Sequence, residues 1–227
     1  MRTLEGRTAL MLPMMGDLAT ECVGSMLGLA AEISNTSEIV IITVSNFSPF
    51  DRARNFLIEN AINHGARYGC FVDADMVTPQ NGFLELVKEL LRMNATIVSG
   101  HYYRRGFPFT SHWSVTLGNG AKYVDYPKDS GSYEINCCGL GFCVIDLDFV
   151  KERLTKPYFK MEYGESEIVT WEDGWFCEKI KKAGGRILGH SGVRCEHLYS
   201  REKIGDDSAL RLRIAEMPKF NQSEKEI

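Results

Sequence analysis

Two aspartates, Asp73 and Asp75, directly follow an apolar run at positions 70–72. Carboxylates are costly to place beside a buried strand unless they are hydrated, paired or bound to a metal. Two of them at alternate positions, where the strand stops, can both face one hard cation. Such a cation can hold a diphosphate and neutralise the charge that develops as it leaves. A bare Asp-x-Asp pattern also occurs in solvated turns, so its interpretation depends on what surrounds it.

The segment just before this strand favours the metal interpretation. It is predicted to be a helix that opens with Asp51, Arg52, Ala53, Arg54 and Asn55. A helix N-terminus that carries two arginines suits anionic oxygens. A surface helix whose arginines pair with nearby carboxylates is the alternative.

The order of Arg54-Asn55 and then Asp73-Ala74-Asp75 resembles nucleotide-sugar glycosyltransferases of the GT-A fold. The resemblance is to the family 2 enzymes that contain an Asp-x-Asp motif, in their small, soluble bacterial or viral form. It implies donor contacts at Arg54, Asp73, Ala74 and Asp75, and a Mn²⁺ or Mg²⁺ ion held by Asp75 and Asp73. It also places the nucleotide base beside the ends of two strands, at Pro13, Met14, Ser45 and Asn46.

Two glycines, Gly139 and Gly141, lie in the segment 137–146. This segment is similar to the glycine-containing strand that follows the acceptor-side loop in these enzymes. Glycine lets another group approach the backbone closely, so we expect sugar or acceptor contacts at both positions. A β-bulge in a core strand is the alternative.

Glu172 and Asp173 precede an apolar helical pattern and resemble the Glu-Asp motif of inverting family 2 enzymes. In that family the acidic residue accepts the proton of the acceptor hydroxyl. Sugar hydroxyls are poor nucleophiles and benefit from such a base, so we assign Asp173 as the base and Glu172 as its competitor. Helix capping is the alternative and is compatible with catalysis. Trp171 and Trp175 offer flat apolar surface to a sugar, or else fill the core.

His197 is the expected third metal ligand. Metal-dependent GT-A enzymes often take a histidine from this C-terminal region, and the resemblance implies the same here. A purely structural histidine is the alternative. The cluster 101–105, with sequence HYYRR, is a further candidate for contacts to the acceptor or the phosphates. Aromatic and arginine side chains also suit nucleic-acid stacking, but the net charge of −4 argues against a nucleic-acid partner.

The candidate residues fall near the ends of predicted strands and helices. We expect strands at 8–14, 38–44, 68–72 and 95–99, and helices at 17–33, 51–64 and 80–93. The β-branched run 38–44 predicts a buried strand, and Asp17 is the expected cap of the first helix. This alternation predicts an α/β, Rossmann-like GT-A fold, with a mostly parallel sheet flanked by helices and ligands at its carboxyl edge. A small mixed β region, a helix at 172–183 and a strand at 186–188 follow.

We expect a single domain over 1–200, which the resemblance implies is a GT-A-like catalytic domain, followed by a peripheral helix near 208–215 and a polar tail within 201–227. Hydrophobic residues make up 44% of the 227 and charged residues 25%, which is typical of globular proteins. No apolar run approaches the ~20 residues of a membrane span, and we expect no signal peptide. The seven cysteines are an odd number and form no Cys-x-x-Cys pair, which favours reduced thiols and a cytoplasmic location.

The resemblance therefore implies a metal-dependent, non-processive hexosyltransferase of carbohydrate biosynthesis. It would move a sugar from a UDP- or GDP-sugar to a hydroxyl of a glycan or other acceptor, with inversion. In a retaining enzyme of the same fold, Glu172 and Asp173 would position the sugar instead. A sugar-1-phosphate nucleotidyltransferase is less favoured, because residues 13–17 lack a glycine-rich basic loop. A non-catalytic nucleotide- or carbohydrate-binding protein is the remaining alternative.

Overall fold

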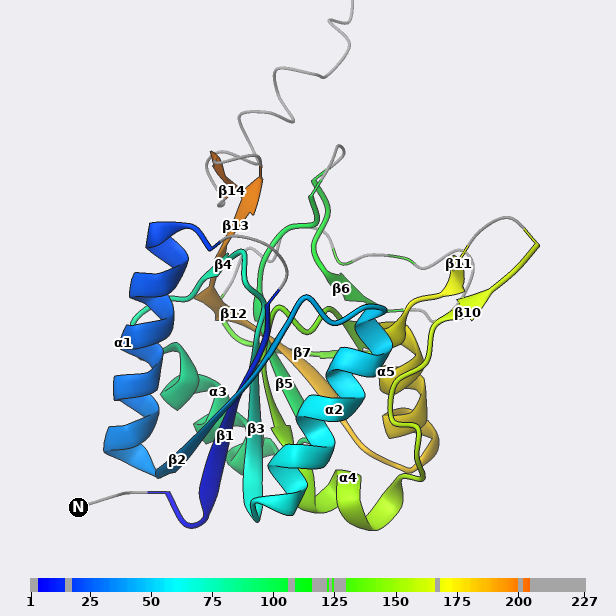
Figure 1. Cartoon of the computed structure of the whole chain (residues 1–227), viewed down its shortest axis with the longest axis horizontal. Coiled ribbons are helices and arrows are strands. Elements are labelled where there is room, and N and C mark those ends of the chain that lie inside the picture. The colour runs from blue at the N-terminus through cyan, green and yellow to red at the C-terminus, as the bar shows by residue number, and fades with distance from the viewer. Residues whose placement is uncertain are drawn as a thin grey trace, which may run out of the picture.

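The computed structural model describes residues 4–14, 18–105, 109–115, 122, 124, 130–165, 168–199 and 202–204 (Figure 1). A seven-stranded sheet with the order β2-β1-β3-β9-β5-β12-β7 forms its centre. Its strands are β1 (Arg7–Met14), β2 (Glu38–Ser45), β3 (Ala66–Val72), β5 (Ile97–His101), β7 (Ser132–Ile135), β9 (Phe142–Asp146) and β12 (Ile187–Arg194). The helices are α1 (Thr20–Thr36), α2 (Phe50–Asn63), α3 (Gly82–Met93), α4 (Leu147–Arg153) and α5 (Glu172–Lys182).

The central sheet is mixed, but most of its strands share one direction. β1 is parallel to β2 and β3, and β12 is parallel to β5. β9 is antiparallel to both of its neighbours, β3 and β5, so those two strands run the same way. β7 is antiparallel to β12. The expected α/β architecture with a mostly parallel sheet is therefore confirmed, and β9 and β7 are its two reversed strands.

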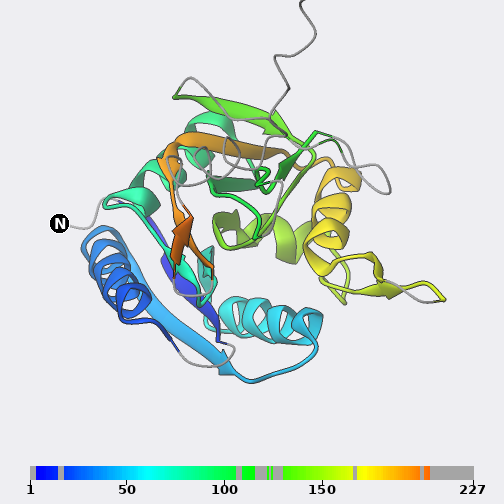
Figure 2. The ribbon, with the colours of Figure 1, turned by 90° about the horizontal axis from the view of Figure 1, so that it is seen from above.

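Helices cover both faces of the sheet (Figures 1 and 2). Because strand side chains alternate between faces, β1 contributes to two separate cores. Ala9 and Met11 pack with residues of α2, α4 and α5, whereas Leu10 and Leu12 pack with residues of α1 and α3. Both faces are thus apolar, and polar side chains can gather only at the ends of the strands.

Two local predictions differ from the structure. β2 lies at the edge of the sheet and is largely exposed, with Ile41 53% accessible, so it is not the buried strand that its β-branched run predicted. A strand's own residues do not reveal how many neighbours it has. The first helix begins at Thr20 after Ala19, whose side chain makes no capping hydrogen bond, so the predicted start at Asp17 is also wrong. Asp17 itself lies outside the described residues.

Small antiparallel sheets are formed mostly by the second half of the chain, where a β region was expected. They pair β10 (Glu162–Tyr163) with β11 (Ile168–Thr170) and β6 (Trp113–Ser114) with β8 (Cys137–Cys138). The third sheet joins β4 (Met76–Val77), β13 (Glu196–Tyr199) and β14 (Glu202–Ile204). The predicted helix at 208–215 lies outside the described residues, and the domain boundary at 200 stays a prediction.

Two further features bear on the sequence-based expectations. All seven cysteines are free thiols. Within the described ranges, no helix has both the length and the apolar character needed to cross a membrane. The cytoplasmic location stays a prediction.

Candidate functional site

The carboxyl edge of the sheet gathers the segments that were expected to bind the donor. Met14 at the end of β1 is in register with Ser45 at the end of β2, and Pro13 lies one position earlier. The Asn46 amide donates to the Met14 carbonyl at 2.9 Å, which ties the two strand ends together. A hollow at the opposite, amino end of these strands is lined by Leu4, Gly6, Arg7, Glu38 and Gly65, and it holds none of the predicted site residues.

The Asp-x-Asp turn is held from two sides by backbone hydrogen bonds. The Asp73 amide donates to the Gly141 carbonyl at 3.0 Å, which anchors the turn to the start of β9. The Leu198 amide donates to the Asp75 carbonyl at 2.8 Å, which anchors it to β13. Ala74 lies half-buried between the two aspartates. Because β13 pairs with β4, directly after the turn, His197 arrives beside Asp75.

Asp75 and His197 face each other. The distance from His197 Nε2 to Asp75 Oδ2 is 3.4 Å. His197 Nδ1 lies 2.7 Å from the Tyr103 carbonyl, which can only accept, so Nδ1 carries a proton and Nε2 points at the carboxylate. Burial opposes the ionisation of Asp75, but the hydrogen bond and charge of His197, followed by the charge of Arg105, outweigh it and lower its pKa.

This pair suits a divalent metal that also binds the substrate. A histidine fixed through Nδ1 by a carbonyl presents Nε2 in the usual manner of a metal ligand. The described residues contain no group of three or more histidine, cysteine or acidic side chains that would hold a metal by themselves. Magnesium-type ions in nucleotide enzymes take one or two protein ligands and complete their shell with phosphates and water. Asp75 and His197 therefore fit such an ion.

Asp73 points to a different partner, Arg54. Arg54 Nη2 lies 3.0 and 3.2 Å from the two carboxylate oxygens of Asp73, and Arg54 Nε lies 3.3 Å from Glu172 Oε1. The arginine is only 5% exposed, and its guanidinium carbon lies 5.1 Å from the centre of the Phe71 ring. Burial opposes its charge, yet the two carboxylates raise its pKa. Arg54 thus joins the Asp-x-Asp turn to the start of α5, while the metal role of Asp73 stays a prediction.

One nitrogen of Arg54, Nη1, takes no part in these contacts. Nη1 is buried and has no hydrogen-bond partner among the described residues. Buried polar groups in folded proteins are almost always paired, so this donor is open to an acceptor that the described residues do not supply.

Asp173 lies next to this ion-pair network. It is half-buried and accepts a hydrogen bond from the Gly174 amide at 2.7 Å. Burial, and then the negative charge of Glu172, raise its pKa to about 6. A carboxyl group with that pKa is mostly ionised at neutral pH and is a much stronger proton acceptor than an ordinary aspartate. Glu172 is bound to Arg54, so Asp173 is the freer of the two candidate bases.

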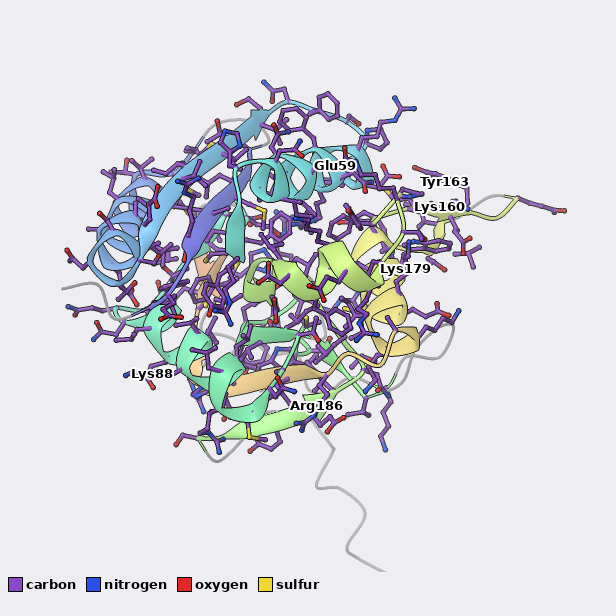
Figure 3. All side chains as sticks on the ribbon, turned by 90° about the horizontal axis from the view of Figure 1, so that it is seen from below. Glu59, Lys88, Lys160, Tyr163, Lys179 and Arg186 are labelled. Atoms are coloured by element: carbon purple, nitrogen blue, oxygen red, sulfur yellow. The ribbon has the colours of Figure 1, made fainter. Side chains whose placement is uncertain are left out.

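The predicted tryptophans have different surroundings. Trp171, at the N-cap of α5, is 53% exposed and presents an open face. The Lys160 ammonium nitrogen lies 4.9 Å from the centre of the Trp175 ring, and the buried Trp175 Nε1 has no hydrogen-bond partner in the described part of the chain. Lys160 lies on the same side of the molecule as Tyr163 and Lys179 (Figure 3). Of the two residues, Trp171 is therefore the accessible one.

Gly139 and Gly141 are needed for packing against Tyr102. A Cβ at Gly141 would lie 2.8 Å from ring atoms of Tyr102, and one at Gly139 would lie 2.3 Å from its hydroxyl. The Tyr102 hydroxyl accepts from the Gly141 amide at 2.8 Å. The space beside both glycines is thus occupied by Tyr102. Contacts from either glycine to a sugar stay a prediction.

This packing gives a stability prediction. Gly141→Ala is expected to lower the free energy of unfolding by about 1–3 kcal/mol, because Tyr102 is buried and cannot retreat. Gly28→Ala is the matched control, because a Cβ added at Gly28 in α1 would meet no described atom within 4 Å. This substitution is expected to raise the free energy of unfolding by about 0.4–1 kcal/mol. Urea denaturation would measure both, and equal effects would contradict the packing argument.

The sequence analysis named Asn55 beside Arg54 without giving it a role, and it missed His112. Asn55 Oδ1 accepts from the amides of Tyr158 and Phe159 at 2.8 and 3.1 Å, so it fixes the segment that leads to β10. The ring centre of His112 lies 4.5 Å from that of Tyr102 and 6.1 Å from that of His197. Burial, and then the charge of His197, lower its pKa to about 3. The adjacency of Asn55 to Arg54 was an available signal, but no spacing pattern points to His112.

Solved structures with a similar fold provide an independent comparison. A197 from STIV matches with a TM-score of 0.64 and 21% identity, over 89% of this chain and 91% of that one. GalNAc-T7, solved with UDP, GalNAc and Mn²⁺, matches with a TM-score of 0.52 and 14% identity, over 86% of this chain and 44% of that one. S. aureus TarS 1-349, in complex with UDP-GlcNAc, gives a TM-score of 0.47 at 12% identity, over 82% and 56%.

No protein-family model matches the sequence, and the search of curated proteins found no match. The fold that the resemblance implied is confirmed by the structural matches: the chain has a GT-A glycosyltransferase-like fold.

Proposed function

We propose that this protein transfers a sugar from a nucleoside diphosphate sugar to an acceptor hydroxyl. The observation that carries the proposal is the bridge made by Arg54, which contacts Asp73 after β3 and Glu172 at the start of α5. Two acidic motifs that are far apart in the sequence thereby share one site at the carboxyl edge of the sheet. That edge is where open α/β sheets bind their ligands.

Asp75 and His197 would hold a Mn²⁺ or Mg²⁺ ion together with the diphosphate of the donor. When bound, the ion supplies positive charge that stabilises the departing diphosphate. The similar fold of GalNAc-T7, whose structure contains UDP, GalNAc and Mn²⁺, supports this choice of ligand and metal. The unpaired Arg54 Nη1 would donate to an oxygen of the donor.

Asp173 would accept the proton of the acceptor hydroxyl. Its raised pKa and its freedom from Arg54 favour it over Glu172 for this step. A single displacement by a hydroxyl activated in this way inverts the sugar's configuration. Trp171, exposed beside Asp173 in the chain, would offer an apolar face to the acceptor.

Nucleotide binding tests the proposal. Wild-type protein would be screened by thermal shift with UDP, GDP, CDP and dTDP, and with UDP- and GDP-sugars, each with Mn²⁺ or with EDTA. We expect one base to raise the unfolding temperature in a Mn²⁺-dependent way, because a ligand that binds only the folded state stabilises it. Asp75→Asn is expected to weaken Mn²⁺-dependent nucleotide binding by about tenfold or more, because it removes a charged metal ligand.

Asp148→Asn is the matched control, since Asp148 is an exposed carboxylate that pairs with Arg67 at 3.7 Å. It should bind nucleotide and metal as the wild type does. A metal-dependent shift that survives Asp75→Asn would show that the metal lies elsewhere. The absence of any shift with every nucleotide would argue against a nucleotide-dependent transferase.

A further inference from the structure

Arg105 contacts the carboxylate oxygen that is proposed to bind the metal. Its Nη1 lies 3.0 Å from Asp75 Oδ2, and His197 Nε2 lies 3.4 Å from the same oxygen. The three side chains differ in accessibility. That of Arg105 is 55% exposed, that of Asp75 is 28% exposed and that of His197 is 8% exposed. The arginine is thus the outer member of the group.

The Arg105 contact and a metal compete for one oxygen of Asp75. Arg105 Nη1 and His197 Nε2 both face Oδ2, the oxygen that a metal held by Asp75 and His197 would share. An ion of the Mg²⁺ type at this oxygen would also be repelled by the charge of the guanidinium group. Metal binding at Oδ2 is therefore expected to weaken the Arg105 contact.

Arg105 can leave at little cost, and the donor offers it a new partner. Arg105 is the exposed partner of this ion pair, so solvent screens the contact and makes it weaker than a fully buried ion pair. A guanidinium group matches the geometry of phosphate oxygens and binds them with two parallel hydrogen bonds. Arg54 cannot move to the diphosphate with two parallel hydrogen bonds, because it is 5% exposed and its Nη2 and Nε are bound to two carboxylates.

We propose that Arg105 is an exchangeable counterion, which neutralises Asp75 in the metal-free protein and moves to the diphosphate when metal and nucleotide bind. The proposal rests on the proposed function of the same site. Its consequence is positive coupling between the two ligands. Metal alone would weaken the Arg105 contact without giving the arginine a new partner, whereas metal and nucleotide together provide one. Because coupling is reciprocal, each ligand should tighten the other by the same factor.

The test measures binding, not turnover. Mn²⁺ affinity without nucleotide would be measured from the electron paramagnetic resonance signal of free Mn²⁺. The affinities of UDP, GDP, CDP and dTDP would be measured by calorimetry, with saturating Mn²⁺ and with EDTA. The proteins compared are the wild type, Arg105→Gln, Asp75→Asn as a metal-site control, and Arg67→Gln. Arg67 is the charge-matched control, because it is an exposed arginine at the amino end of β3 that pairs with Asp148.

Arg105→Gln is expected to bind Mn²⁺ alone about two- to tenfold more tightly than the wild type, because glutamine removes the competing ion pair at Asp75 Oδ2 and the like-charge repulsion. The same variant should bind the nucleoside diphosphate more weakly in Mn²⁺, so that the coupling factor falls. Arg67→Gln should change neither value. Unchanged or weaker Mn²⁺ binding by Arg105→Gln, with Asp75→Asn still abolishing it, would overturn the exchange and leave the proposed function standing. No Mn²⁺ binding by the wild type in any condition would overturn both.

Discussion

Asp173→Asn is expected to lower the rate of sugar transfer about 10²- to 10⁴-fold, the usual contribution of a positioned general base. Asparagine keeps the shape of the side chain and the hydrogen bond from the Gly174 amide, but it cannot accept a proton. The affinity for nucleotide and Mn²⁺ should therefore stay close to that of the wild type. Release of nucleoside diphosphate from the donor sugar, with acceptor or with water, would measure the loss. A rate within a few-fold of the wild type would remove Asp173 from the base role.

The pH dependence of the wild type provides a second test of the same residue. Asp173 must be ionised to accept a proton, and its pKa is raised to about 6. The rate should therefore rise as the pH increases through about 6 and level off above it. In Asp173→Asn the remaining activity should lack this rise. A wild-type profile that is flat from pH 5 to 8 would show that no base with this pKa limits the rate.

The stability of Asp173→Asn separates catalysis from folding. The folded-state pKa of Asp173 lies above the unfolded value of about 3.9, so the folded state holds this proton to higher pH. The stability that this proton adds is present below the unfolded value and is lost as the pH rises through about 6. Removal of the buried charge should therefore leave the unfolding temperature at pH 7 equal to or above that of the wild type. A large loss of stability would mean that the activity loss reports on folding.

Arg54→Met is expected to lower the free energy of unfolding by about 3–5 kcal/mol, the usual effect of removing one partner of a buried ion pair. The reason is that Glu172 is itself buried, with 9% side-chain exposure, and would be left without a counter-charge. Urea denaturation would measure the loss. The control Arg67→Gln breaks a pair in which both side chains are over 40% exposed, and it should cost no more than about 1 kcal/mol.

A second substitution tests whether the uncompensated charge causes this loss. In Arg54→Met/Glu172→Gln the buried carboxylate is removed together with the arginine, so part of the lost stability should return. The double-mutant cycle would then show a coupling energy between the two positions that lies within about 0.5–3 kcal/mol. Strictly additive effects would mean that Arg54 stabilises the protein through Asp73 or through its packing on Phe71, and not through Glu172.

The sequence alone determined the class of fold and the order of most elements. The apolar runs that became β1, β3 and β5, and the amphipathic patterns of α2 and α3, are local features whose periodicity reflects burial on one or both faces. The sequence also predicted that Asp73 and Asp75 lie at the end of a strand. It likewise placed Glu172 and Asp173 at the start of a helix. Each of these predictions depends only on residues that are close together in the sequence.

Only the tertiary structure decided which of these residues meet. The insertion of β9 between β3 and β5 brings Gly141 to Asp73, and the pairing of β13 with β4 brings His197 to Asp75. The exposure of β2, the bridge from Arg54 to Glu172 and the pKa of Asp173 likewise depend on distant neighbours. The physical reason is that burial and charge act through space. Periodicity places a side chain on a face of its own element, but the groups opposite that face come from other parts of the chain.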